Sequence, residues 1–176
     1  SITPTVRFNP SYFRQLPEEV KALGCDPDYN AWTESINTPP DNELPMRTGA
    51  GHIHLGWRES NKNITTPEHF YDCIQATKQL DSSLFVGSLL WDFDKDRRKM
   101  YGDRGTFRPK PYGLEYRVLS NAWLKEEALM SWVYKTTRHA MDLLADEMYL
   151  HYDPRIGEDF QDQNAREAYT ILVKDY

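Results

Sequence analysis

Two short segments of the chain alternate polar and apolar residues with a period of two. The first reads GHIHLGW over residues 51–57, and the second reads GLEYR over residues 113–117. In an extended strand, successive side chains point to opposite faces, so every second residue shares a face. Each segment is therefore predicted to be a strand with one polar face and one apolar face that packs on a core.

The polar faces of the two predicted strands carry complementary chemistry. His52 and His54 share the polar face of the first strand, and Glu115 and Arg117 share that of the second. If the strands belong to one sheet, they present two imidazoles, a carboxylate and a guanidinium together. This set suits a divalent metal ion and phosphate oxygens.

Length and composition fit one globular domain. The chain has 176 residues, 39% hydrophobic and 27% charged, which is enough to build one core and unlike a disordered chain. A net charge of −6 argues against a protein that binds nucleic acid mainly through phosphates. No apolar run approaches the ~18 residues of a membrane span, and the sequence shows no cleavable signal pattern, so neither membrane insertion nor secretion is expected. Cys25 and Cys73 lack metal-ligand spacing and are interpreted as thiols in a reducing, cytoplasmic compartment.

The remaining pattern predicts an α+β fold in which helices pack against one face of a small, mostly antiparallel sheet. The first fifty residues are rich in proline, and only Glu18–Leu23 looks helical there. The later predicted elements are a helix from Thr66 to about Trp91 with an interruption near Asp81, a charged loop over 92–112, a strand over 114–119, a helix from Asn121 to about Met148, and a last helix over Phe160–Val173.

Each motif also has a simpler interpretation. Two histidines on a strand can hydrogen-bond within a polar pocket, and a Glu-x-Arg pair can be the solvated face of an edge strand. Gly51 and Gly56 favour a functional site, because glycine removes side-chain bulk where a ligand or another backbone approaches. Arg104 and Arg108 belong to a charged segment that is either a surface loop or, with its glycines, a loop that binds phosphate.

Four motifs follow one another between residues 24 and 123: GCDPDYNAW over 24–32, RTGAGHIHLGW over 47–57, YGxRGxFR over 101–108 and YGLEYRVLSNxW over 112–123. In this order they resemble the phage-type carboxylate-amine ligases, distant members of the glutamine synthetase-like amidoligase superfamily. Several ordered motifs together are more specific than any one of them. The resemblance implies that residues 1–176 form a single domain, the C-terminal half of a glutamine synthetase-like catalytic domain.

The resemblance also implies a role for each matching residue. His52 and Glu115 would bind one metal ion, Mg²⁺ or Mn²⁺, and His54 would reach an ATP phosphate. Arg117 would contact the substrate carboxylate or the phosphoryl group that is transferred. The implied reaction is the ATP-dependent joining of a carboxylate and an amine, from small molecules or peptides, through an acyl phosphate. The product is an amide or isopeptide bond.

The resemblance further implies that Arg104 and Arg108 are the counterparts of the family's arginines that bind nucleotide phosphates, and that Arg108 is also a catalytic candidate. The family's other metal carboxylates lie upstream of the His-x-His strand, and the four glutamates of residues 1–50 form no Glu-x-Glu strand. The chain is therefore interpreted as a half that needs an N-terminal complementary polypeptide or segment for activity. It would act in the cytoplasm, that of the host cell if the gene belongs to a phage, with neither nucleic acid nor membrane as a partner.

Two other functions stay open. A non-catalytic binding or virion-associated protein would keep the ligase fold without turnover. His52, His54 and Glu59 also fit the first metal motif of a cupin, a metal enzyme on a double-stranded β barrel. Two long predicted helices, and no suitable histidine on a later strand, argue against the cupin.

Overall fold

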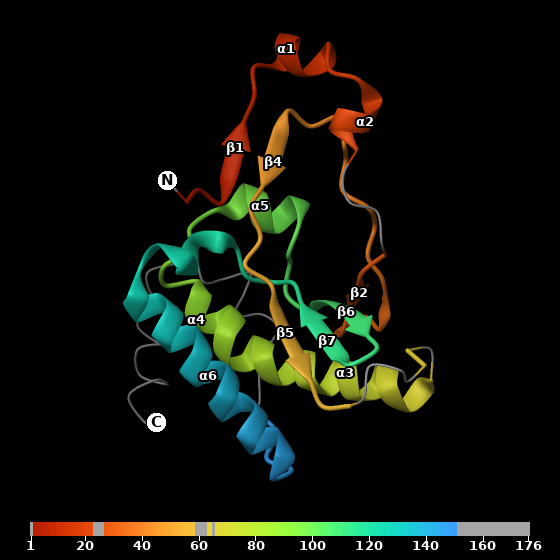
Figure 1. Ribbon diagram of the computed structural model, residues 1–176, viewed down its shortest axis with the longest axis vertical. Helices are drawn as coiled ribbons and strands as arrows, with labels where there is room; N and C mark the ends of the chain where they lie inside the picture. The colour runs from red at the N-terminus through yellow and green to blue at the C-terminus, as the bar shows by residue number, and fades with distance from the viewer. Residues whose placement is uncertain (1, 23–26, 59–62, 65, 151–176) are drawn as a thin grey trace.

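The computed structural model describes residues 2–22, 27–58, 63–64 and 66–150, which form a body and a narrower arm (Figure 1). The arm contains β1 (Thr5–Arg7), α1 (Pro10–Arg14), α2 (Glu18–Lys21) and β4 (Met46–Thr48). The sheet of the body contains β2 (Tyr29–Asn30), β3 (Ser35–Ile36), β5 (Ile53–Gly56), β6 (Thr106–Lys110) and β7 (Gly113–Tyr116). The helices of the body are α3 (Pro67–Leu80), a π-helical segment (Asp81–Phe85), α4 (Val86–Ser88), α5 (Lys95–Met100), a 3-10 helix (Asn121–Lys125) and α6 (Glu127–Ala145).

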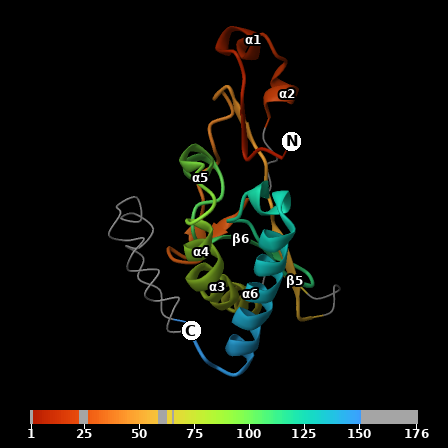
Figure 2. The same ribbon diagram turned by 90° about the vertical axis from the view of Figure 1, so that its left-hand side faces the viewer.

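The sheet of the body has the order β3-β2-β6-β7-β5, and all of its neighbouring strands are antiparallel. Tyr29, Phe107, Tyr116 and Ile53 form one row across four strands, and they face α3. α3 packs directly on β6 and β7, and α6 lies beside α3 in both views (Figures 1 and 2). The predicted α+β class, with a small antiparallel sheet and helices on one face, is confirmed.

Helix α3 forms where the sequence predicts it. The Thr66 hydroxyl caps its first turn by accepting a hydrogen bond from His69 N, and Pro67 occupies the first helical position, where a missing N–H costs nothing. The predicted interruption near Asp81 is confirmed as the π-helical segment, after which the helix ends at Ser88 instead of about Trp91. An inserted π turn leaves one residue out of the regular pattern and redirects its side chain.

Three predictions about local structure were wrong. The segment 92–112 is not a loop, because it contains α5 and β6. The Asp94 carboxylate caps α5 by accepting from Arg97 N, and the buried Arg97 guanidinium donates to Val118 O at 2.5 Å and to Leu119 O at 2.8 Å. These contacts anchor α5 to the chain after β7, and no local sequence pattern predicts them.

The helix predicted from Asn121 to Met148 is two elements, a 3-10 helix and α6. The N-terminal fifty residues contain a second short helix, α1, whose first turn is capped by Asn9, and four short strands. These strands have only two or three residues each, too few to show alternation. The predicted helix over Phe160–Val173 and Cys25 lie outside the described residues.

Candidate functional site

The Glu115 carboxylate is the centre of a polar cluster on the face of the sheet away from α3. Its Oε1 lies 2.7 Å from His52 Nδ1 and 2.6 Å from Arg117 Nη1. Its Oε2 lies 3.2 Å from Lys110 Nζ and 3.5 Å from Arg108 Nη1. Four groups, two on β6 and one each from the residues next to β5 and β7, therefore converge on one buried carboxylate, and we call this set the Glu115 cluster.

The register of the sheet explains this convergence. His54 on β5 and Arg108 on β6 lie directly opposite Glu115 on β7. Directly opposite residues of antiparallel strands project to the same face. Lys110 follows Arg108 by two residues, and His52 precedes His54 by two, so both share that face as well. The alternation that predicts the two strands also places their polar side chains together.

The His52 imidazole is neutral at physiological pH. Its burial, together with the neighbouring Arg117 cation, lowers the pKa of His52 to about 4, although Glu115 opposes the shift. The 2.7 Å contact with Glu115 places the ring proton on Nδ1, so Nε2 carries the lone pair. His52 Nε2 is buried and accepts no hydrogen bond from any group in the described part of the chain. A neutral ring with a free lone pair is the form of histidine that binds metal ions.

Glu115 is ionised. Burial alone would raise its pKa, but the hydrogen bond from Lys110 and the charges of Lys110 and Arg108 hold the pKa of Glu115 below its usual value. Three cations contact this carboxylate, and each of its oxygens already accepts from two groups. The excess of positive charge around Glu115 favours an additional anion near it.

Arg117 is held in place on three sides. Its side chain is only 4% exposed, and its Nε lies 3.2 Å from Asp28 Oδ2. The Asp28 carboxylate also accepts a hydrogen bond of 3.0 Å from Asn37 Nδ2. The guanidinium lies over the Tyr101 ring, with Cζ 4.9 Å from the ring centroid, an arrangement that stabilises the cation. The direction of Arg117 is therefore set before any ligand binds.

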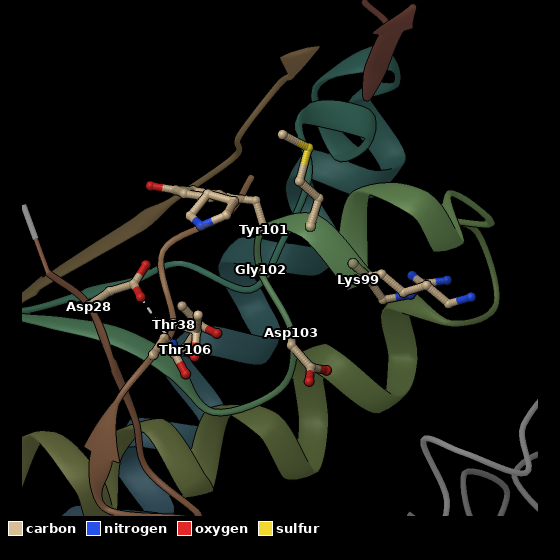
Figure 3. A pocket seen from close by; sticks show the side chains of 11 residues that line it. Asp28, Thr38, Lys99, Tyr101, Gly102, Asp103 and Thr106 are labelled. Atoms are coloured by element: carbon tan, nitrogen blue, oxygen red, sulfur yellow. Dashed lines mark hydrogen bonds between the residues drawn. The ribbon is translucent and has the colours of Figure 1, made fainter. Parts of the chain in front are cut away.

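A polar cavity of about 180 Å³ lies next to Asp28, and Thr38, Thr106 and Gly102 contribute to its wall (Figure 3). Figure 3 shows Asp28 pointing toward Thr38 and Thr106, with Tyr101 on another side of the space. Because Asp28 and Tyr101 also contact Arg117, this cavity adjoins the Glu115 cluster. Its size suits a small polar group.

The structure brings together four of the six predicted site residues: His52, Arg108, Glu115 and Arg117. His54 lies on the same face but is exposed, and its Nδ1 is 2.5 Å from the Tyr112 hydroxyl. Arg104 lies in the turn before β6. There its amide donates to the Asp103 carboxylate and its carbonyl accepts from Asn30 Nδ2.

Sequence reasoning missed several contributors to the site. Lys110 has a usable signal, because it stands two residues after Arg108, but the signal is clear only once 106–110 is known to be a strand. Asp28 reaches Arg117 across 89 positions of the chain, and Tyr101 covers Arg117 from the residue after α5. Contacts of this kind depend on the tertiary fold and leave no local pattern.

The predicted metal pair fits a divalent ion in part. His52 and Glu115 offer a neutral imidazole and an ionised carboxylate, the states that metal binding requires. Glu115 contacts Nδ1, however, so the free lone pair on Nε2 points away from the carboxylate, and one ion reaches both groups only if the His52 ring turns. Across the described residues, however, no three His, Cys, Asp or Glu side chains gather into a metal-binding group. Mg²⁺ prefers octahedral coordination with mostly oxygen ligands, so further ligands would have to come from substrate, water or another segment.

Comparison with protein-family models, with curated proteins and with solved structures gave no match. None of the helices in the described ranges is long and apolar enough to cross a membrane.

Proposed function

We propose that this chain forms part of the active site of an ATP-dependent carboxylate-amine ligase, which makes an amide or isopeptide bond through an acyl phosphate. The observation that supports this most is the convergence of His52, Arg108 and Arg117 on Glu115. These residues belong to the motifs through which the chain resembles the phage-type ligases. The proposal includes the glutamine synthetase-like form of the α+β fold.

The chemistry of the proposed reaction suits this cluster. A carboxylate is a poor acyl donor, and conversion to an acyl phosphate gives it a leaving group that an amine can displace. Phosphoryl transfer depends on positioning and on stabilising the charge of the transferred group. Arg117, fixed by Asp28 and Tyr101, and Arg108 would provide that stabilisation in a buried setting. His54, exposed at the rim, and Arg104, in the turn before β6, are the proposed contacts to nucleotide phosphates.

His52 and Glu115 are the proposed protein ligands of Mg²⁺ or Mn²⁺, an ion that neutralises charge on the phosphates of ATP when it is bound. The remaining ligands would come in part from a complementary polypeptide or segment. β5, which bears His54, is the last strand of its sheet and offers a free edge for such pairing among the described residues. The cytoplasm is the proposed location, because a reducing compartment and ATP are both present there.

A second candidate is a binding protein without turnover, and one observation favours it. Each oxygen of Glu115 already contacts two groups, as expected for a charge network that holds three strands together. The cupin alternative receives no such support, since Glu59 lies outside the described residues. Within the described ranges, the strands form an open five-stranded sheet and a two-stranded pair.

The test is an assay of ADP release that requires both a carboxylate and an amine, with the 176-residue chain alone and with the complete gene product. We expect activity from the complete product only. Arg117→Ala and Glu115→Gln should each lower kcat by about a hundredfold or more, whereas Arg138→Ala and Glu19→Gln, at exposed positions, should not. Arg108→Ala should weaken ATP binding. Turnover by the chain alone would refute the need for a complement, and absence of turnover with a broad amine panel would favour the binding protein.

A further inference from the structure

A second cavity near the Glu115 cluster is larger than the polar cavity of Figure 3. It has a volume of about 560 Å³ and lies at the end of β6 away from the polar cavity of Figure 3. Ligand sites for small organic molecules typically have volumes of roughly 300–1,000 Å³. The cavity is therefore large enough for a ring system.

One wall of this cavity is aromatic. Tyr29 and Phe70 line it, with ring centroids 5.1 Å apart in an edge-to-face arrangement. The Phe107 ring lies behind both, 5.9 Å from Tyr29 and 5.6 Å from Phe70. Ile64 adds a partly exposed apolar side chain at the opening. Packed aromatic rings present edges and faces against which another flat ring stacks favourably.

The strand edge beside the cavity is closed to peptide pairing. Arg117 N donates to Thr106 O, so the backbone groups of the even-numbered residues of β6 face β7. The backbone groups of Phe107, Pro109 and Pro111 therefore point to the other side of β6, toward β2. On that side, β2 pairs with β6 only at Thr106 and Phe107. Beyond this point both outward-facing residues are prolines, which have no N–H to offer to an added strand. This edge favours a small molecule over an extended peptide.

Two cations connect the cavity to the Glu115 cluster. Arg108 and Lys110 line the cavity and also contact Glu115 Oε2, at 3.5 and 3.2 Å. A ligand in the cavity therefore meets an apolar, aromatic wall on one side and positive charge on the side toward Glu115. Both features must be matched by one molecule.

We infer that this cavity binds a planar aromatic group that is joined to an anionic group, with the ring against Tyr29 and Phe70 and the anion near Arg108 and Lys110. The ring can come from the base of a nucleotide or from an aromatic carboxylate. The inference rests on the proposed function in one respect only, the identity of the ligase substrate that carries the ring. Binding is measured without turnover, so a failure of the inference is distinguishable from a failure of the proposed function.

The experiment is calorimetric titration of the purified chain with two sets of probes. The first set is adenosine monophosphate, adenosine and ribose 5-phosphate, and the second is indole-3-acetate, indole and acetate. The ring-bearing anion of at least one set should bind about tenfold more tightly than either of its parts. Adenosine monophosphate alone would identify a nucleotide, and indole-3-acetate alone an aromatic carboxylate. Equal binding of ribose 5-phosphate or acetate, or no binding in either set, would overturn the inference.

Variants locate the site. Ile64→Trp fills the cavity from a partly exposed position and should abolish binding, whereas Val20→Trp on α2 should not. Lys110→Gln should weaken the ring-bearing anion about tenfold, as loss of a charge-assisted contact does, and Lys135→Gln should leave it unchanged. Nuclear Overhauser contacts between the ligand ring and the protons of Tyr29 and Phe70 provide an independent check. Unchanged binding in Ile64→Trp, or contacts to other rings, would place the ligand elsewhere and refute the assignment.

Discussion

Glu115 and Asp81 are two buried carboxylates on opposite faces of β7, and their surroundings differ in charge. Glu115 contacts three cations, and two of them, Lys110 and Arg108, hold its pKa below the usual value despite its burial. Asp81 is fully buried, which raises its pKa to about 7, although hydrogen bonds from Trp32 Nε1 at 2.6 Å and the Tyr116 hydroxyl at 2.8 Å oppose the rise. Burial alone therefore does not decide ionisation; the charge of the partners does.

The two carboxylates also differ in what they join. Tyr116 follows Glu115 on β7, so its side chain crosses to the helix side of the sheet and meets Asp81 in the π-helical segment. Asp81 thereby ties the helix to the sheet and, through Trp32, to the chain after β2. The face with Glu115 carries the charge that suits a ligand, whereas the face with Asp81 has neutral donors and serves the fold.

The largest effect is expected from Glu115→Ala. It leaves Arg108, Lys110 and Arg117 close together without their shared carboxylate. Removal of one partner from a buried charge network typically costs about 3–5 kcal/mol. Urea unfolding at neutral pH measures this loss, with Glu19→Gln, at an exposed position, as a control that should change stability by less than about 0.5 kcal/mol. A loss under about 1 kcal/mol in Glu115→Ala would show that the cations reach solvent easily.

Asp81→Asn tests the opposite face through the pH dependence of stability. The pKa of Asp81 is raised from 3.8 to about 7 on folding, so the folded state binds this proton more tightly than the unfolded state. The stabilisation of the folded state by this bound proton is complete below about pH 4 and is lost as pH rises through about 7. At about 1.4 kcal/mol per pKa unit, the change is on the order of a few kcal/mol.

Asparagine cannot ionise, so the variant should lack this loss and should gain stability relative to the native chain between pH 5 and pH 8. Unfolding free energies of both proteins over that range provide the measurement. The Asp103 charge, which adds to the raised pKa, is tested by Asp103→Asn. Parallel curves for Asp81→Asn and the native chain would show that Asp81 is already ionised at low pH.

The protonation state of His52 reports on the Glu115 face alone. Its pKa of about 4 reflects burial first and the Arg117 cation second. Arg117→Gln should therefore raise the pKa of His52 by about one unit, and Arg138→Gln should not change it; imidazole proton shifts in NMR titrations report both. Because the folded pKa lies below the unfolded value of 6.5, His52 contributes stability above that pH and loses it as pH falls toward 4. A pKa near 6.5 in the native chain would contradict a buried, neutral ring.

The comparison shows which parts of the site were predictable. The pairs His52 and His54, and Glu115 and Arg117, follow from alternation within a few residues, a local property of extended strands. The face they share was therefore predictable from sequence. β6 was not, because the dense charge, the two glycines and the two prolines of residues 92–112 made this segment resemble a loop. In the structure Pro109 is compatible with a strand, since its nitrogen faces the open side where no ladder hydrogen bond is needed.

The role of Gly51 was also predictable only in part. Gly51 was interpreted as space for a ligand or another backbone, and the structure assigns it to the latter: a Cβ at this position would lie 2.2 Å from Trp123 Nε1 and 2.3 Å from Ser120 O. Asp81 was predicted only as a helix interruption. Its contacts with Trp32 and Tyr116 join three separate segments, and such a meeting is fixed by the tertiary fold.

The smallest expected effect is that of Tyr116→Phe, which separates the two faces most cleanly. The substitution removes one neutral hydrogen bond to Asp81 and keeps the ring in the core. A bond of this kind contributes about 1 kcal/mol. Because the Tyr116 hydroxyl stabilises the ionised carboxylate, its loss should also raise the pKa of Asp81 further. The stability difference from the native chain should therefore grow as pH rises from 5 to 8.

Urea unfolding at pH 5 and at pH 8 measures this stability difference, with Tyr134→Phe on the exposed side of α6 as the control. The NMR-detected pKa of His52 should stay the same, since the phenol lies on the other face of the sheet. A shift of that pKa would mean that the two carboxylates are coupled through β7, and a constant stability difference would mean that Asp81 does not titrate in this range.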